Sequence, residues 1–336
     1  MKKIGLIGYG YWGPNLARNI EGSSQFELSA ILEINPDRRR TACSKHPSTE
    51  IVASLDELYK LSLDAVAIAT PVSTHYALVK KSLLEGLHVL VEKPLTGSVV
   101  EAEELVALAK EKDLALMVDH TFLYTSAVQK IKSLIDAGDI GNLLYYEADR
   151  ENLGLFQKDV NAMWDLSVHD ISILSYIFHE TPKKVTAIGS RSLENSPEST
   201  TYLSLAFDGF KVASIRANWL SPVKVRRIVI GGSKKIIIYD ELNTIEKIKI
   251  YDKGVNPLPT DSLDEKHNQA ITYRHGDVYS PNLDDIEALS NMIEKFAQEM
   301  SGPRTREGSG ETGLSIVKIL SAAQKSMDRS GEPVEV

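Results

Sequence analysis

Residues 1–20, MKKIGLIGYGYWGPNLARNI, decide the fold, because Gly8, Gly10 and Gly13 follow a G-x-G-x-x-G spacing. The apolar run before Gly8 predicts a strand, and the residues from Gly13 onward predict a helix. Glycines in this context are typical of a dinucleotide-binding βαβ unit. Gly8 permits a tight turn, Gly10 lets a pyrophosphate approach the backbone, and Gly13 allows the helix to pack closely on the strand. We expect the helix N-terminus to offer free N–H groups and its dipole to the phosphates.

An acidic residue that distinguishes the two nicotinamide cofactors follows the glycines. Glu33 lies 20 residues after Gly13, at the end of the second predicted strand. A carboxylate there accepts hydrogen bonds from the ribose of NAD and repels the 2′-phosphate of NADP. Arg38 is close by in the sequence and can accommodate that phosphate, so NADP stays open as the less favoured cofactor. We expect Tyr11 and Trp12 to cover the cofactor or the domain cleft rather than to take part in the chemistry.

The first third of the chain alternates short apolar runs with helical segments. The runs are nearly continuous in apolar residues, as in strands that are buried on both faces, and they lie at 3–7, 27–33, 64–70, 88–92 and 114–119. Alternation of strands and helices predicts a doubly wound parallel sheet. We therefore predict an α/β Rossmann domain that binds NAD over residues 1–122.

From about residue 126 the chain has longer strands with short connections. We predict them at 142–152, 184–192, 201–207, 210–219, 225–232 and 234–240, with Asp208-Gly209 as a two-residue hairpin turn. Helices are predicted at 126–138, 164–178, 283–300 and 311–328. Short connections imply antiparallel pairing. Residues 123–336 are therefore predicted to form an α+β domain with an open, mainly antiparallel sheet and helices on one face.

Composition excludes several classes of protein. The chain has 336 residues, a net charge of −8 and one cysteine, Cys43. The length favours two domains, the charge argues against a nucleic-acid partner, and an intrachain disulfide is impossible. No apolar run approaches the length of about 20 residues that a membrane span needs, and no signal sequence is evident. We expect a cytoplasmic protein with no membrane partner. Ligand spacing for a metal and a G-x-S-x-G elbow are both missing, so neither a metal centre nor a serine hydrolase is predicted.

Two short motifs carry candidate catalytic residues. Lys93, in VEKPL, follows a predicted parallel strand, and ligands of such sheets bind beyond the carboxyl ends of the strands. Asp165 and His169 are four residues apart in WDLSVHDISILSYIF, so on a helix they share one face. A carboxylate in that position can orient the histidine ring and its proton. An exposed structural lysine, a capping aspartate and a surface histidine are the alternative interpretations.

Basic and polar residues of the second domain are candidates for substrate binding. Arg150 and Asn152 alternate on one face of a strand and could bind hydroxyl or phosphate groups of a substrate. In SPVKVRRIVI, Lys224 and Arg226 share one strand face, and Arg227 lies on the other. Lys224 and Arg226 could hold the diphosphate of a nucleotide sugar, or their side chains could simply be solvated.

Taken in order, the motifs resemble those of the glucose–fructose oxidoreductase, inositol dehydrogenase and rhizopine-catabolism (Gfo/Idh/MocA) oxidoreductases. They are the glycine motif, ATPVSTH at 69–75, EKP at 92–94 and the D-x-x-x-H pair, and the resemblance runs nearly the full chain. It implies a Rossmann domain joined to an α+β domain whose sheet forms a homodimer or homotetramer. It also implies reversible hydride transfer at a ring carbinol, with Lys93, Asp165 and His169 lining the site. Further residues would flank the cofactor, namely Ala69, Thr70, Pro71, His75 and Glu92.

The closest resemblance is to nucleotide-sugar dehydrogenases that oxidise the 3-hydroxyl of UDP-N-acetylglucosamine on the way to amino sugars of surface polysaccharide. It rests on GYGYWGPNLARN near the start and on SPVKVRRI. Two stretches differ from other members. Residues 160–162 read Val-Asn-Ala where many carry Gly-Gly, and TFLYTSA at 121–127 lacks an arginine that many sugar-binding members have. Both differences argue against recognition of a free monosaccharide or inositol in the usual manner.

The expected reaction moves a hydride from a sugar C–H to nicotinamide and a proton from the adjacent hydroxyl to the protein. We expect His169 to move the proton, Lys93 to stabilise the reacting oxygen, and Asp165 to orient the pair. The roles of Lys93 and His169 could be exchanged. The alternatives are a myo-inositol or free-sugar dehydrogenase, a glycosidase that uses NAD transiently, and a regulatory protein that senses NAD without turnover.

Overall fold

The computed structural model describes residues 1–154, 156–157, 160–257, 271–302 and 304–336. The chain divides into two compact units. Unit 1 comprises residues 1–125 and 285–321, and unit 2 comprises residues 126–284 and 322–336. The predicted domains, 1–122 and 123–336, differ from these units mainly in the placement of residues 285–321.

Unit 1 contains a sheet whose six strands are all parallel, in the order β3-β2-β1-β4-β5-β6. The predicted doubly wound sheet is confirmed. Its strands are β1 (Lys2–Ile7), β2 (Phe26–Leu32), β3 (Glu50–Val52), β4 (Ala65–Ile68), β5 (His88–Glu92) and β6 (Leu116–Asp119). All four residues of β4 and of β6 are buried, as expected for central strands covered on both faces. The short edge strand β3 was not predicted, since three residues give no readable pattern.

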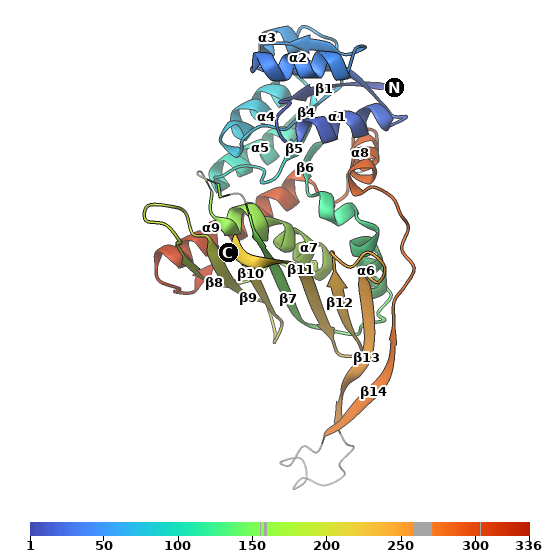
Figure 1. The fold of residues 1–336 in the computed structure, drawn as a ribbon, viewed down its shortest axis with the longest axis vertical. Coiled ribbons are helices and arrows are strands. Elements are labelled where there is room, and N and C mark those ends of the chain that lie inside the picture. The colour runs from blue at the N-terminus through green and yellow to red at the C-terminus, as the bar shows by residue number, and fades with distance from the viewer. Residues whose placement is uncertain (155, 158–159, 258–270, 303) are drawn as a thin grey trace. The chain divides into compact units, whose positions relative to one another are not determined.

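Helices cover both faces of this sheet (Figure 1). They are α1 (Gly13–Gly22), α2 (Pro36–Lys45), α3 (Leu55–Leu58), α4 (His75–Leu84), α5 (Val99–Glu111) and α8 (Ala288–Glu299), with 3-10 turns η1 (Val72–Thr74) and η2 (Thr121–Tyr124). The helix α9 (Gly310–Asp328) begins in unit 1 and ends in unit 2.

Helix α8 belongs to unit 1 because it packs on α1 and η2. Phe296 stacks on Phe26 of β2 with ring centroids 5.9 Å apart. The side chain of Glu287, just before α8, accepts hydrogen bonds from Arg18 and Asn19 of α1. The prediction that this helix begins at residue 283 was wrong, since it begins at Ala288 after an extended Glu287.

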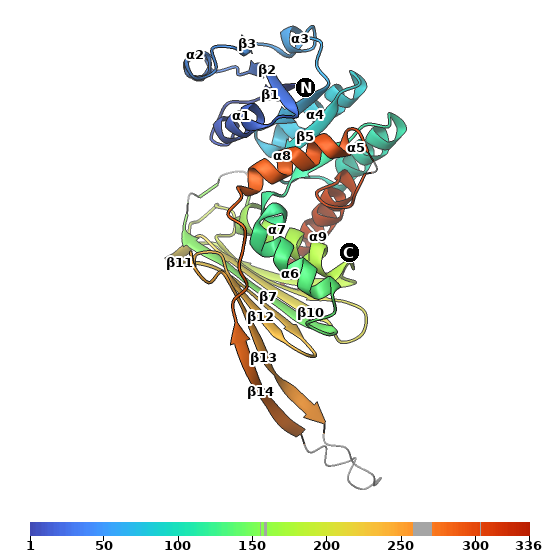
Figure 2. The same ribbon diagram turned by 90° about the vertical axis from the view of Figure 1, so that its right-hand side faces the viewer.

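Unit 2 contains a nine-stranded sheet in the order β14-β13-β12-β11-β7-β10-β9-β8-β15. Only β10 and β7 pair in parallel among its described strands, so the predicted open, mainly antiparallel sheet is confirmed. The strands are β7 (Leu143–Leu153), β8 (Lys184–Ser190), β9 (Thr200–Ala206), β10 (Val212–Asn218), β11 (Leu220–Gly232), β12 (Ile236–Asp240), β13 (Ile248–Pro257), β14 (Ile271–Tyr279) and β15 (Val334–Glu335). In Figures 1 and 2, helices α6 (Ser126–Asp136) and α7 (Val168–Phe178) lie over one face of this sheet.

Three local features of unit 2 differ from expectation. The turn between β9 and β10 holds three residues, because Phe207 N donates to Lys211 O at 3.1 Å and encloses Asp208, Gly209 and Phe210. The prediction of a two-residue turn was therefore wrong. The β13–β14 pair was not predicted, and it extends beyond the neighbouring strands (Figure 1). The helix expected from Trp164 starts with a π-helical turn at Met163–Ser167 and becomes α-helical at Val168.

Candidate nucleotide-binding and catalytic site

Unit 1 has a cavity of about 1140 Å³ at the carboxyl ends of its parallel strands. This is the edge at which open α/β sheets bind ligands. Most residues predicted to bind the cofactor line it: Gly8, Gly10, Tyr11, Trp12, Glu33, Arg38, Ala69, Thr70, Pro71, Glu92 and Lys93. The structure thus gathers segments from four strand ends around one hollow. Gly13 and His75 do not line this cavity, and both residues are buried.

The three glycines each meet a different steric demand. Gly8 has φ +96°, and a Cβ there would lie 2.5 Å from the carbonyl oxygen of Ala69. A Cβ on Gly13 would lie 2.5 Å from the carbonyl oxygen of Gly8, so this glycine allows α1 to approach β1. Gly10 differs, because among the described atoms a Cβ would meet only Nη1 of Arg38, at 3.2 Å. The open side of Gly10 faces the cavity and leaves the backbone accessible to a phosphate.

The start of α1 suits an anion. Its N-cap residue, Trp12, makes no side-chain capping hydrogen bond, and Pro14 stands in the first turn. By contrast, α2 is capped by Asn35, whose side chain accepts from the N–H groups of Asp37 and Arg38. Pro14 has no N–H, and the N–H groups of Asn15 and Leu16 donate to the carbonyl oxygen of Trp12, so Gly13 supplies the N–H at this helix start that an anion could accept.

Glu33 is fixed by backbone hydrogen bonds at the edge of the cavity. It is 4% exposed, and its carboxylate accepts from the N–H groups of Tyr9, at 2.9 Å, and Asn35, at 2.8 Å. The Nε of Arg38 lies 3.8 Å from Oε2 of Glu33, and its side chain is half exposed. A fixed carboxylate and a more accessible guanidinium therefore stand together where the adenosine ribose of a dinucleotide would lie.

The two aromatic residues of the glycine loop differ in their surroundings. Tyr11 is 91% exposed, and its ring stacks on that of Trp12 with centroids 6.5 Å apart. The indole Nε1 of Trp12 donates to Oδ2 of Asp119 at 3.2 Å. Trp12 therefore ties the glycine loop to the end of β6, whereas Tyr11 extends over the cavity rim.

His75 holds together two loops of the site from behind. Its ring is 1% exposed, with Nδ1 2.9 Å from the carbonyl oxygen of Pro94 and Nε2 2.9 Å from that of Thr70. Burial lowers the pKa of His75 below 6.5, against the effect of these carbonyl groups. A neutral ring can donate to one carbonyl at a time. We had predicted that His75 flanks the cofactor, and the structure gives it this bracing position.

The ends of β5 and β6 bring together four ionisable side chains. Glu92 pairs in register with Asp119, and Lys93 and His120 follow them. Asp119 and His120 are at most 2% exposed. Burial, and then the charge of Lys93, lower the pKa of His120 to about 3. Sequence analysis did not single out Asp119 or His120, although VDHT directly after a buried strand was an available signal.

In unit 2, the D-x-x-x-H segment is anchored to the sheet through Asp165. Its Oδ2 accepts from Nε1 of Trp219 at 3.1 Å, and Trp219 is buried against Ala162 and Leu166. π-Helical turns occur often at functional sites, and this one contains Asp165. His169 follows in the first turn of α7 and is partly exposed. This pair belongs to unit 2, whereas Lys93 belongs to unit 1.

The predicted substrate residues of unit 2 have different partners. Arg150 is 3% exposed, and its Nε and Nη2 each lie 2.9 Å from an oxygen of Asp170 on α7. Arg226 stands opposite Arg150 in the sheet, and its Nη2 donates to Oδ1 of Asn152 at 2.8 Å. Lys224 is exposed. The structure therefore engages Arg150 in a buried ion pair and Arg226 with Asn152, and it leaves Lys224 in contact with solvent.

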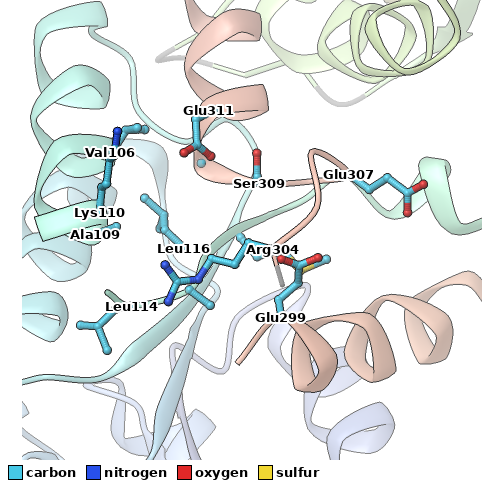
Figure 3. A pocket seen from close by; sticks show the side chains of 13 residues that line it. Val106, Ala109, Lys110, Leu114, Leu116, Glu299, Arg304, Glu307, Ser309 and Glu311 are labelled. Carbon is cyan, nitrogen blue, oxygen red and sulfur yellow. The ribbon is translucent and has the colours of Figure 1, made fainter. Parts of the chain in front are cut away.

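A second, smaller cavity of unit 1, about 140 Å³, lies between α5, β6 and residues 299–311 (Figure 3). Two of its charged side chains have partners nearby. The carboxylate of Glu299 accepts from N and Oγ1 of Thr305, and Arg304 pairs with Asp113 at 3.0 Å. This cavity is much smaller than the one at the strand ends, and we assign it no ligand.

Neither a metal centre nor a membrane-spanning helix occurs among the described residues. Within the described ranges, no group of three or more His, Cys, Asp or Glu side chains is arranged to hold a metal ion. Across the same part of the chain, no helix has both the length and the apolar character needed to cross a bilayer.

Comparison with known proteins agrees with this geometry. Residues 2–120 match the oxidoreductase family with an NAD-binding Rossmann fold, and residues 128–238 match the Gfo/Idh/MocA C-terminal domain. The chain is 26% identical over 327 residues to UDP-N-acetylglucosamine 3-dehydrogenase of Acidithiobacillus ferrooxidans, covering 95% of this chain and 98% of that protein. It is 24% identical over 345 residues to the NADP-dependent scyllo-inositol 2-dehydrogenase of Bacillus subtilis, covering 96% and 93%.

Structural comparison supports the fold independently. A solved structure of the Acidithiobacillus ferrooxidans UDP-N-acetylglucosamine 3-dehydrogenase superposes with a TM-score of 0.82 at 23% identity, covering 98% of each chain. The family matches together span both the Rossmann segment and most of the second sheet. On these grounds the chain belongs to the Gfo/Idh/MocA family of NAD-binding oxidoreductases.

Proposed function

We propose that this protein is an NAD-dependent dehydrogenase that oxidises a ring hydroxyl of a sugar, with UDP-N-acetylglucosamine at C3 as the first candidate substrate. The observation that carries the proposal is the cavity of unit 1, which joins the glycine loop, Glu33 and Lys93 along one sheet edge. Similarity to a UDP-N-acetylglucosamine 3-dehydrogenase over nearly the full chain supports the substrate class.

The residues of unit 1 fit a dinucleotide. The open side of Gly10 and the start of α1 would hold the pyrophosphate, and Glu33 would accept hydrogen bonds from the adenosine ribose. The Ala69–Pro71 segment and Lys93 line the same cavity and would flank the nicotinamide. When bound, NAD supplies the acceptor for the hydride. We favour NAD over NADP because Glu33 is fixed in place by two backbone N–H groups.

The chain's own residues would manage the proton of the substrate hydroxyl. His169 has a ring that is partly exposed, and an imidazole can both accept and donate a proton, which suits proton transfer. Lys93 would donate to the reacting oxygen and stabilise negative charge on it. Asp165, held by Trp219, would fix the orientation of the helix start that carries His169. The reverse assignment of Lys93 and His169 remains the alternative within the same proposal.

Recognition of a nucleotide sugar would involve the basic stretch of β11. Lys224 is exposed, while Arg226 is partly buried and bonded to Asn152 and to the carbonyl oxygen of Glu151. Lys224 is therefore the better placed of the two to reach a diphosphate. Because Arg150 is engaged by Asp170, we assign it a smaller part in substrate binding than the sequence suggested.

Self-association through the sheet of unit 2 is part of the same proposal. Ile188 and Tyr202 are register partners on β8 and β9, and both are about half exposed. Val212 of β10 is similarly exposed. Apolar side chains on a sheet face are typical of subunit interfaces. We expect a homodimer or homotetramer in a cytoplasmic setting. Light scattering after size-exclusion chromatography measures the molar mass of the assembly and so the number of subunits.

The deciding experiment measures NADH absorbance with a panel of UDP-sugars, inositols and free sugars. We expect turnover with a UDP-N-acetylhexosamine and little with myo-inositol or glucose. Turnover confined to an inositol would favour the activity named for the Bacillus subtilis relative. Tight NAD binding with no turnover on any member of the panel would favour a sensor. A Lys93→Met variant assayed in parallel separates enzyme turnover from background reduction.

A further inference from the structure

Two carboxyl groups meet behind the candidate catalytic lysine. Glu92 and Asp119 are the last residues of the neighbouring strands β5 and β6, and they are register partners. Register partners on adjacent parallel strands direct their side chains to the same face of the sheet, so the two carboxyl groups are neighbours. Oε1 of Glu92 is buried and has no hydrogen-bond partner among the described residues. Asp119 is 2% exposed.

Two carboxylates that are neighbours in a buried place repel each other, which favours a proton on one of them. The other contacts of the pair indicate which group carries it. Asp119 accepts from Nε1 of Trp12 through Oδ2 and from Oγ1 of Thr121 through Oδ1. Donors on both oxygens favour the ionised form of Asp119. Glu92, with one oxygen buried and unpartnered, has no comparable set of donors.

We propose that Glu92 and Asp119 share a single proton carried by Glu92, and that Asp119 is a positioning residue whose carboxylate joins the glycine loop to the end of β5, the residue before Lys93. Burial, followed by the charge of Asp119, raises the pKa of Glu92 well above its ordinary value, in agreement with this placement. Trp12, which lines the cofactor cavity, is then held by a fixed anion instead of a neutral acid.

The shared proton also sets the charge around Lys93. Lys93 is the cation that acts on Glu92, and His120 is kept neutral by burial and by Lys93. With the proton in place, the pair presents one negative charge to Lys93. With both carboxylates ionised it would present two, which would hold the lysine more firmly in its protonated form. This inference rests on the proposed function only where it assigns Lys93 to catalysis.

Nuclear magnetic resonance of the indole N–H groups tests the proton without any turnover. The signal of Trp12 in ¹⁵N-tryptophan-labelled protein is assigned with Trp12→Phe. We expect it to shift at a pH above the ordinary carboxyl range, when Glu92 ionises. Glu92→Gln should abolish that higher step. The absence of a step above the ordinary carboxyl range, or an unchanged higher step in Glu92→Gln, would overturn the proposal.

The two conservative variants should behave differently. The amide of Glu92→Gln can still donate to Asp119, so the Trp12 signal and the melting temperature should remain close to native. Asp119→Asn removes the anion that three donors share, so we expect a displaced Trp12 signal and about tenfold or more weaker NAD binding. The exposed Asp208→Asn is the matched control and should change neither. Equal effects of Glu92→Gln and Asp119→Asn would refute the assignment of the proton to Glu92.

A gentler variant covers the case in which Asp119→Asn does not fold. Thr121→Val removes one donor to Oδ1 of Asp119 and leaves Trp12 in place. It should displace the Trp12 signal and raise the pH of its higher step, because a less stabilised Asp119 anion competes with Glu92 for the shared proton and the pair loses that proton less readily. An unchanged Trp12 signal in Thr121→Val would overturn the proposal that Asp119 positions Trp12. Native turnover by Lys93→Met would refute the catalytic role that we propose for Lys93. The spectra of Trp12 would still test the shared proton, because they do not depend on turnover.

Discussion

The Nε of Arg38 lies 3.8 Å from Oε2 of Glu33, so the acidic side chain at the end of β2 has a cation beside it. The two groups favour different cofactors. Glu33 is held by the N–H groups of Tyr9 and Asn35 and repels an added phosphate, whereas the half-exposed Arg38 would attract one. Cofactor choice therefore depends on which of the two side chains reaches the ribose.

We expect NAD to bind more tightly than NADP, and Glu33→Gln to narrow the difference. Each 1.4 kcal/mol of lost discrimination would change the ratio of dissociation constants by about tenfold. Arg38→Ala is the matched variant and should weaken NADP more than NAD. Titration of tryptophan fluorescence, with Trp12 in the loop, measures both constants. Equal or tighter binding of NADP by the native protein would contradict this prediction.

The catalytic set gives a prediction on turnover. Lys93→Met and His169→Ala should each lower kcat by roughly 10²–10⁴, the usual effect of losing an acid or base. Asp165→Asn should cost less, because it disturbs orientation without removing the proton carrier. The losses should not add, since groups that act as one unit fail together.

Steady-state kinetics with the preferred sugar measures these effects, and NAD titration provides the control. NAD affinity should survive the changes at His169 and Asp165, which lie in unit 2. A Lys93→Met variant with near-native turnover would mean that the lysine is structural.

The buried pair of Arg150 and Asp170 predicts a large effect on stability. Both side chains are at most 4% exposed, and two hydrogen bonds of 2.9 Å join them. Asp170→Asn should lower the free energy of unfolding by about 3 kcal/mol, because it leaves a buried guanidinium with only the more distant carboxylate of Glu241, at 3.4 Å, as its counter-ion. Adding Arg150→Met should recover part of the loss. Urea denaturation measures both.

A substrate-binding role of Arg150 would give the opposite pattern. Arg150→Met alone would then raise KM for the sugar and leave the unfolding free energy unchanged. That result would restore the interpretation that the sequence suggested.

His120 predicts a loss of stability in mild acid. Its pKa is about 3 in the folded protein and near 6.5 when unfolded, so only the unfolded chain takes up the proton between those values. Stability should fall as the pH is lowered from 6.5 toward 3, and His120→Phe should flatten this slope. His75, whose pKa is also lowered, contributes in the same direction. Glu92 acts in the opposite direction, because its raised folded pKa makes its contribution full below 4.5 and lost at higher pH.

Denaturation at pH values between 7 and 4 gives the slopes. His179→Asn, at a half-exposed histidine, is the matched control. If the unfolding free energy of the native protein and of His120→Phe had the same dependence on pH, protonation of His120 would not be coupled to folding.

Much of unit 1 could be predicted because its signals are local. The strand β5 has the predicted bounds of 88–92, and α1 begins at the predicted Gly13. A run of apolar residues specifies a buried strand, and the three glycines specify a turn that other residues cannot form. Glu33 followed from its distance in sequence to that turn. The cofactor residues were found together because every parallel strand delivers its carboxyl end to the same edge.

The sequence did not predict which side chains the charged residues of unit 2 would pair with. Arg150 alternates with Asn152 as a substrate-binding pair would, yet its counter-ion comes from Asp170 on α7. Arg226 was assigned to a diphosphate, and the structure pairs it with Asn152. An ion pair depends on which side chains a fold brings within about 4 Å, and strand periodicity carries no information about that distance.

Local sequence was enough to predict the two kinds of sheet and the glycine turn, because backbone conformation and strand burial depend on neighbouring residues. The packing of α8 on unit 1, through Phe296 on Phe26, and the position of Asp119 beside both Trp12 and Glu92 emerged only from the folded chain. These contacts join residues that are 270 positions apart in the first case and 107 in the second, counting Phe26 to Phe296 and Trp12 to Asp119. Burial and proton sharing arise from such long-range packing, which no local pattern encodes.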